Sequence, residues 1–302
     1  MKRLFWFIVF CLMLGGAMAQ ERRTLRVLAI GNSFSEDAVE QYLWNLGREA
    51  GVDMIIGNAY RGGWSLSAHW NDARSRAADT EYRKVVDGVR TNLGKRTLRD
   101  IITDEPWDVI TFQQVSQEAG RESSYEPGLS LMIGYVRALV LVDSVRLGFH
   151  QTWAYAQDSD HRGFANYDRN QFLMYAHITT AVEEAMDFHR GDLSFYIPSG
   201  TAIQNARTSS LNTPSPDGAP VNRELTRDGF HLNYTIGRYT VACTWLEALT
   251  GISAVGLKTR PKSITPEQAA LAQRAAHAAI LVPMAVTPIG VENMEFDEQP
   301  TE

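Results

Sequence analysis

Cysteine is almost absent from this chain of 302 residues, which contains only Cys11 and Cys243. Cys11 lies in an apolar stretch near the start, so the rest of the chain has a single thiol and no intramolecular disulfide. Cys243 lies in the run Tyr239–Leu246, which is typical of a buried helix. We therefore expect Cys243 to be a small core residue and not a nucleophile.

Long apolar runs and an excess of positive charge are also missing. No segment after the first 20 residues approaches the roughly 18 apolar residues of a transmembrane helix, so we expect no integral membrane span. The formal net charge is −6, which argues against a nucleic-acid partner. The histidines show no metal-ligand spacing with one another or with a cysteine, so we predict no metal and no cofactor.

The first residues have the pattern of a secretory signal peptide. Lys2 and Arg3 precede the apolar stretch Leu4–Leu14, and small residues follow as far as Ala19. We expect residues 1–19 to be removed by cleavage after Ala19 and the protein to be exported, to the periplasm or the exterior.

The remainder, residues 20–302, shows no Pro/Gly/Ser-rich linker, no internal repeat and no low-complexity tract. The chain's length and the 44% hydrophobic content of its full sequence are enough for one large core. We therefore predict a single domain, with a polar tail over about 285–302 that frays.

Apolar runs of strand length recur along the chain and alternate with amphipathic helical stretches. The runs lie at 25–31, 53–58, 108–113, 145–150 and 193–197. This alternation predicts an α/β fold, a three-layer α/β/α sandwich around a five-stranded parallel sheet.

The later part of the chain reads as helical, and two stretches break the alternation. Helices are predicted from Tyr234 to Leu249, with Gly251 as a stop signal, and from Thr265 to Leu281. Residues 60–95 and 153–168 are long and irregular in pattern, and we expect them to form loops over the carboxyl edge of the sheet.

A short motif at Gly31–Ser35 (Gly-Asn-Ser-Phe-Ser) follows the first predicted strand and precedes a segment with helical spacing. Ser33 therefore falls on a strand-to-helix turn. A serine at the carboxyl end of a buried strand points into the crevice where open α/β sheets bind ligands. The N–H groups that begin the following helix are available to a developing oxyanion.

A second motif, Asp228–Leu232 (Asp-Gly-Phe-His-Leu), lies near the end of the chain. Asp228 precedes His231 by three residues, close enough for its carboxylate to orient the imidazole. His231 could then take the proton of Ser33. Each motif alone is also typical of an ordinary turn or helix cap, but their joint occurrence at a sheet edge favours a catalytic site.

The two motifs resemble the first and fifth blocks of the SGNH (GDSL-like) hydrolase superfamily, and within it a little-characterised branch of exported bacterial proteins. The resemblance covers the chain from Val27 to about Gly251. It implies a flavodoxin-like sandwich with Ser33 as the nucleophile, His231 as the base and Asp228 as the acid that orients it.

The same resemblance implies an oxyanion hole. The second block of the family supplies a glycine N–H, for which Gly63 is favoured over Gly62. The third block normally supplies an asparagine amide, and here Gln113 and Gln114 follow the strand instead. A glutamine amide can donate the same hydrogen bond from one methylene farther away. The expected donors are thus the backbone N–H groups of Ser33 and Gly63 with the side chain of Gln113 or, second, Gln114.

Aromatic residues near the predicted site raise the question of substrate. Trp64, Trp153 and Tyr155 could stack on a sugar ring, although large aromatic side chains are commonly buried. The resemblance implies a serine esterase that forms an acyl-enzyme on a small-molecule or glycan ester, with O-acetylated carbohydrate as the substrate class. Two alternatives stay open: a lipase or thioesterase acting on acyl chains, and a glycan-binding protein without turnover.

Overall fold

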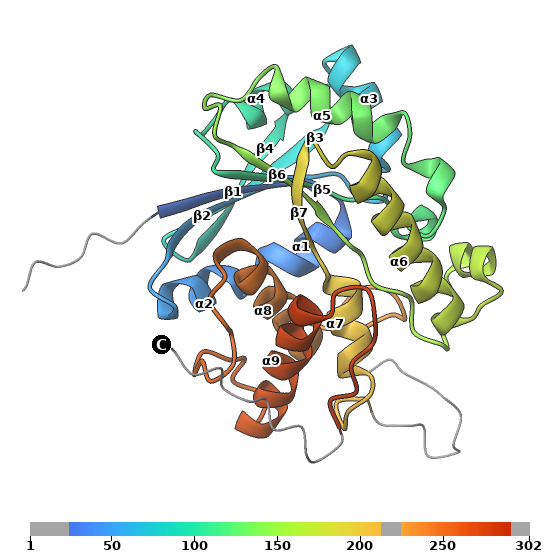
Figure 1. Cartoon of the computed structure of the whole chain (residues 1–302). Helices are drawn as coiled ribbons and strands as arrows, with labels where there is room; N and C mark the ends of the chain where they lie inside the picture. Colours follow the sequence, from blue (N-terminus) through green and yellow to red (C-terminus); the bar gives the residue numbers. More distant parts are fainter. Residues whose placement is uncertain (1–23, 213–224, 291–302) are drawn as a thin grey trace, which may run out of the picture.

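A seven-stranded sheet runs through the centre of the molecule in the order β4-β3-β2-β1-β5-β6-β7 (Figure 1). The computed structural model describes residues 24–212 and 225–290, so the predicted signal peptide and most of the predicted tail lie outside the described residues. The strands are β1 (Thr24–Gly31), β2 (Asp53–Tyr60), β3 (Thr80–Val86), β4 (Val89–Arg96), β5 (Val109–Phe112), β6 (Arg146–His150) and β7 (Leu193–Ile197).

Five of these strands, β2-β1-β5-β6-β7, are parallel and coincide with the five predicted runs. Counted among themselves, they have the order 2-1-3-4-5 of flavodoxin-like sheets, which confirms the predicted α/β sandwich. The chain leaves β1 toward β2 on one side and later returns to β5 on the other. The carboxyl end of β1 is therefore a topological switch point, where such sheets bind their ligands.

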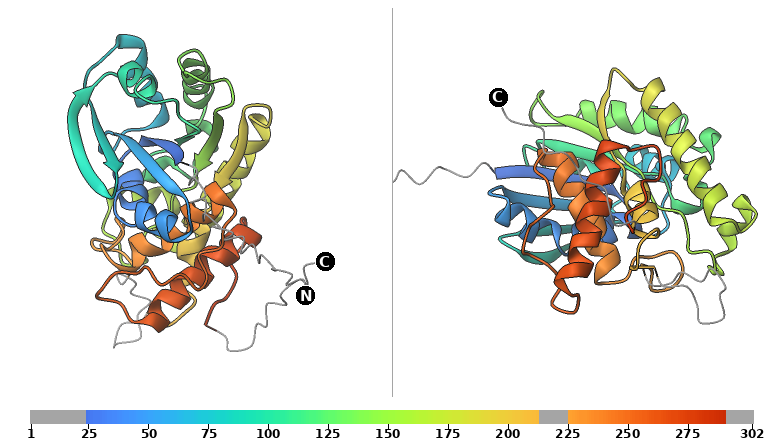
Figure 2. Two further views of the ribbon diagram at one scale, coloured as in Figure 1. Left: turned by 90° about the vertical axis from the view of Figure 1, so that its left-hand side faces the viewer. Right: turned by 60° about the horizontal axis from the view of Figure 1, so that its bottom comes forward.

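Helices cover both faces of the sheet. In two views, α3, α4 and α5 lie over one face, and α1, α2, α8 and α9 lie over the other (Figure 1; Figure 2). The helices are α1 (Ser33–Val39), α2 (Leu43–Glu49), α3 (Leu66–Ser75), α4 (Leu98–Ile102), α5 (Gly128–Arg137), α6 (Gln171–Phe188), α7 (Ser199–Ala206), α8 (Ile236–Thr250) and α9 (Pro266–Leu281).

The last two helices follow the sequence signals closely. Helix α8 ends at Gly251, whose φ of 72° is the left-handed cap expected of a stop glycine. Helix α9 begins with a capping box formed by Thr265 and Gln268. Cys243 is fully buried in α8, as predicted. Within the described part of the chain, no helix combines the length and the apolar character needed to cross a membrane.

The expectation of loops over 60–95 is wrong. This stretch contains α3 and a hairpin, β3 and β4, which extends the sheet antiparallel to β2. The hairpin turns at Asp87-Gly88, where both residues have positive φ (51° and 76°), as a two-residue type I′ turn requires. Its strands are polar and β4 is largely exposed, so they lack the apolar pattern by which strands are recognised.

Two histidines, His69 and His150, are buried in the core. Burial lowers the pKa of His69 to about 4 and that of His150 to about 3, whereas an unfolded chain titrates near 6.5. Below about pH 6.5 the unfolded state therefore binds more protons, and the free energy of unfolding falls as the pH falls. At about pH 5 the two residues together should remove about 4 kcal/mol.

Denaturant unfolding at about pH 7.5 and about pH 5 tests this expectation. The variant His150→Gln keeps a polar side chain that does not titrate, so its loss of stability between the two pH values should be about half that of the wild-type protein. An unchanged pH dependence in the variant would show that His150 is not a source of the effect.

Candidate active site

Ser33, His231 and Asp228 form a chain of hydrogen bonds at the carboxyl end of β1. The Ser33 Oγ lies 2.8 Å from His231 Nε2, and His231 Nδ1 lies 2.7 Å from Asp228 Oδ2. An ionised carboxylate can only accept hydrogen bonds, so the imidazole proton is on Nδ1 and Nε2 is left to accept the serine hydroxyl. This is the arrangement in which an imidazole removes a proton from a nucleophilic serine.

The turn that carries Ser33 is fixed by its neighbour Asn32. Asn32 caps α1, because its Oδ1 accepts the N–H of Phe34 at 3.1 Å, and its Nδ2 donates to Trp64 O at 3.0 Å. As the first residue of α1, Ser33 has a backbone N–H without an acceptor inside the helix. That N–H is therefore available to a bound substrate.

The turn that carries His231 is organised by Asp228. Its Oδ1 accepts the backbone N–H of His231 at 2.7 Å and that of Phe230 at 3.2 Å, and Gly229 takes a φ of 89° that favours glycine. Partial burial raises the pKa of Asp228, but the hydrogen bonds from the His231 side chain and from the backbone outweigh it and hold the pKa below its usual value. Asp228 is thus an anion at neutral pH.

A pocket of about 430 Å³ opens beside Ser33 and His231. Its wall comes from four segments, around Ser33, Gly63, Ser116 and His231, together with the side chain of His161. A larger pocket of about 630 Å³ lies against β7 and is lined by α6 and α8 residues, but it contains none of the three residues of the hydrogen-bonded chain. The chemistry therefore belongs to the smaller pocket.

The predicted oxyanion donors divide into two groups. Gly62 and Gly63 both line the pocket, and Gly63 has a φ of 69°. The two glutamines are buried and do not line it. Gln113 Nε2 donates to Asn32 Oδ1 at 2.7 Å, and Gln114 Nε2 donates to Ser124 O at 2.7 Å.

These contacts use both glutamine amides away from the pocket, which corrects the prediction that one of them faces a developing oxyanion. The expectation that the two adjacent side chains point in opposite directions is confirmed. Gln113 bonds to Asn32 in the turn after β1, whereas Gln114 Oε1 accepts the N–H of Leu66 at the start of α3. Gln113 instead helps to fix Asn32, and through it the position of Ser33.

Two of the three aromatic residues predicted to bind substrate are fully buried, Trp153 and Tyr155. Trp153 stacks on Phe34 with ring centroids 4.2 Å apart, and its Nε1 donates to Phe230 O at 2.7 Å. A buried ring offers no face to a sugar, so the stacking role is corrected to a structural one: Trp153 packs between the two segments that carry Ser33 and His231.

Trp64 is half-buried, and the guanidinium of Arg61 lies 3.8 Å from the centre of its ring. Trp64 does not line the pocket. Its role in binding substrate stays a prediction.

Six polar residues on the pocket wall were not identified from the sequence, among them Ser116 and Gln117. The other four are Glu36, Tyr60, His161 and Arg227. Glu36 follows Ser33 by three residues, so helical spacing places the two side chains on the same face of the helix. Arg227 directly precedes Asp228 of the second motif. These two signals in the sequence would have predicted both residues. Within the described residues, no cluster of histidine, cysteine and carboxylate side chains could hold a metal ion.

Comparisons with known proteins agree with this picture of the fold. Among curated proteins, no sequence match was found. The chain is 46% identical to a DUF4886 family protein of known structure from Bacteroides uniformis, with a TM-score of 0.81 over 87% of this chain and 97% of that one.

More distant solved structures are matched at lower similarity. A candidate SGNH hydrolase from Slackia heliotrinireducens is 15% identical, with a TM-score of 0.48 over 75% of this chain and 99% of that one. An acetylxylan esterase from Geobacillus stearothermophilus is 12% identical, with a TM-score of 0.46 over 75% and 94%. The family model described as "Domain of unknown function (DUF4886)" matches residues 26–279. The chain therefore belongs to the DUF4886 family.

Proposed function

We propose that this protein is an exported serine esterase, with O-acetylated carbohydrate as its substrate class. The observation that carries the proposal is the continuous hydrogen-bonded chain from Ser33 through His231 to Asp228 beside an open pocket. Export is proposed from the signal-peptide pattern of residues 1–19.

In the proposed reaction, Ser33 Oγ attacks the ester carbonyl while His231 Nε2 takes the hydroxyl proton. The backbone N–H groups of Ser33 and Gly63 stabilise the tetrahedral oxyanion. His231 then gives its proton to the departing alkoxide as the ester C–O bond breaks, which leaves the acyl group on Ser33. Water, deprotonated by His231, attacks this acyl-enzyme, and the carboxylic acid leaves as Ser33 regains its proton.

The character of the pocket supports a polar alcohol portion. Glu36, Tyr60 and Arg227 line it, and residues of these types carry polar groups that can exchange hydrogen bonds with sugar hydroxyls. A site for long acyl chains would need a larger and more apolar wall. We therefore favour a small acyl group on a carbohydrate over a lipid substrate.

Acetate release by the purified protein tests the proposal. The substrates are acetylated xylan, acetylated monosaccharides and p-nitrophenyl esters of increasing acyl length, each run beside Ser33→Ala. Acetate release by the wild-type protein alone supports the esterase and its substrate class. A rate that rises with acyl length would favour a lipase or thioesterase. Binding of acetylated glycan by both proteins, with no ester hydrolysed, would replace the proposal by a binding role.

A further inference from the structure

One buried carboxylate, Asp37, lies one helical turn after Ser33 in α1 and contacts the segment that carries the other two members of the triad. Its Oδ2 accepts the backbone N–H of Leu232, the residue after His231, at 2.8 Å. Arg227, the residue before Asp228, donates to both carboxylate oxygens at 3.0 and 3.2 Å. Asp37 therefore contacts both ends of the short segment that contains Asp228 and His231.

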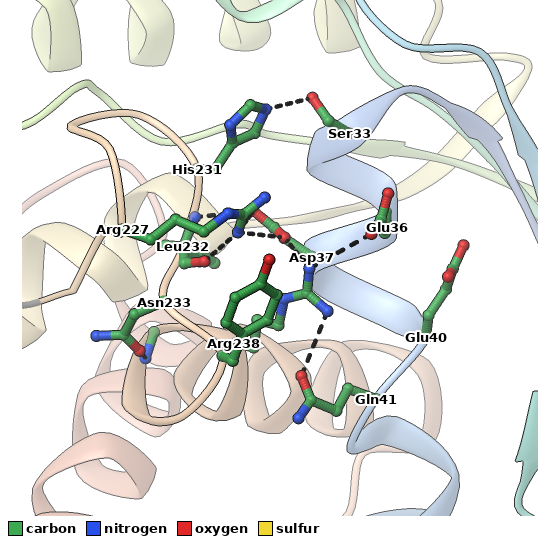
Figure 3. Close-up of polar contacts among 12 residues, drawn as sticks. Ser33, Glu36, Asp37, Glu40, Gln41, Arg227, His231, Leu232, Asn233 and Arg238 are labelled. Atoms are coloured by element: carbon green, nitrogen blue, oxygen red, sulfur yellow. Dashed lines mark hydrogen bonds and ion pairs between the residues drawn. The ribbon is translucent and has the colours of Figure 1, made fainter.

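A second arginine completes the surroundings of Asp37. Arg238, in the first turn of α8, forms an ion pair with Asp37 at an N–O separation of 2.6 Å. Figure 3 shows the side chains of Arg227 and Arg238 converging on Asp37, with the His231 side chain above them. Arg227 also donates to Leu232 O, so a hydrogen bond joins the first and last residues of the segment.

The balance of charge explains why this carboxylate can be buried. A buried anion is tolerated when cations and hydrogen-bond donors replace its water shell. Burial raises the pKa of Asp37, and the neighbouring Arg238 and Arg227 act in the opposite direction. The carboxylate accepts hydrogen bonds from Arg227 and from the Leu232 N–H, and it forms an ion pair with Arg238. These contacts fix where the segment lies relative to α1.

We infer that Asp37 is a positioning residue for the catalytic pair: by binding Arg227, Arg238 and the Leu232 N–H, it sets the separation between Ser33 Oγ and His231 Nε2. The inference rests on the proposed function, since it assigns a role within the same site. Asp37 does not line the pocket, so it acts on the reaction through the 2.8 Å contact of Ser33 with His231.

The test compares Asp37→Asn with a matched control, Glu247→Gln. Glu247 is also a buried carboxylate on a helix; it accepts the N–H of Ala254 at 2.8 Å and contacts His277 at 2.8 Å, away from the active-site pocket. Both variants remove a buried charge that ties a loop to a helix, so both should lower the midpoint of thermal unfolding. Hydrolysis of p-nitrophenyl acetate is measured for each.

We expect Asp37→Asn to lower kcat by about 10- to 100-fold at nearly unchanged KM, because a displacement of about 1 Å between reacting groups has effects of this size. Glu247→Gln should keep the wild-type kcat. Equal kcat values for the two variants, beside an active wild-type protein, would overturn the inference and leave the proposed function standing. A wild-type protein as inert as Ser33→Ala would overturn both.

A second variant keeps the inference testable if Asp37→Asn does not fold. Arg238→Gln removes one cation from Asp37 but leaves Arg227 and the Leu232 N–H in place. It should lower kcat by a smaller factor, again at unchanged KM. A folded Arg238→Gln protein with the kcat of the wild type would overturn the inference.

Discussion

Replacement of Ser33 by alanine is expected to lower kcat/KM for ester hydrolysis by about 10³-fold or more, because the proposed mechanism forms the acyl-enzyme on the Ser33 hydroxyl. The fold should be unaffected. The Ser33 hydroxyl is hydrogen-bonded to His231 Nε2 at 2.8 Å, and both residues line an open pocket. Removing the hydroxyl therefore leaves no buried polar group without a partner. Steady-state hydrolysis of p-nitrophenyl acetate and thermal unfolding measure the two effects.

The other serine of the motif provides the matched control. Ser35 is buried, and its Oγ lies 2.7 Å from Asn32 O and 2.8 Å from Asn58 Oδ1. Ser35→Ala should therefore show the reverse pattern, with the free energy of unfolding lowered by about 1–2 kcal/mol and most of the turnover retained. A Ser33→Ala protein with a near-normal rate would show that Ser33 is not the nucleophile.

The substitution Asp228→Asn should lower kcat by about 10²- to 10⁴-fold, although it changes the shape of the side chain very little. The two carboxylate oxygens accept different donors: Oδ1 the backbone N–H groups of Phe230 and His231, Oδ2 the Nδ1–H of His231. Asparagine has one acceptor oxygen. If this oxygen keeps the backbone bonds, the NH₂ group faces Nδ1 and moves the imidazole proton to Nε2, so His231 can no longer accept the proton of Ser33.

The experiment is a comparison of kcat for wild type, Asp228→Asn and Asp108→Asn with p-nitrophenyl acetate. Asp108 is the matched control because its carboxylate also accepts a backbone N–H, that of Arg26 at 2.7 Å, outside the pocket. Asp108→Asn should keep the wild-type rate. A rate for Asp228→Asn within about threefold of the wild type would mean that Asp228 only shapes the turn.

The sequence was sufficient to predict the central part of the fold, for a physical reason. The five parallel strands are covered on both faces, so they appear as short apolar runs, and the helix ends carry cap signals such as Gly251. The hairpin β3-β4 was missed because charged and polar side chains interrupt the apolar pattern of both strands, although Asp87-Gly88 is a typical hairpin turn.

The site shows the same division. Ser33, Asp228 and His231 lie in two local motifs, and the structure brings them into hydrogen-bond contact. The directions of Gln113 and Gln114 depend on partners from other segments, such as Asn32, which no local pattern reveals. Asp37 likewise contacts the segment around His231 although the two are far apart in the sequence.

The polar hairpin that was missed has a consequence for how the protein behaves in a crowded solution. Without the hairpin, β2 would be the outermost strand, and its backbone N–H and C=O groups on that side would be unpaired. An exposed edge of this kind can pair with a strand from another chain. The hairpin moves the edge outward to β4, which is exposed and carries the cationic side chains of Arg90, Lys95 and Arg96. Positive charge along an outermost strand opposes edge-to-edge aggregation, so this side of the sheet is protected against the first step of fibril growth.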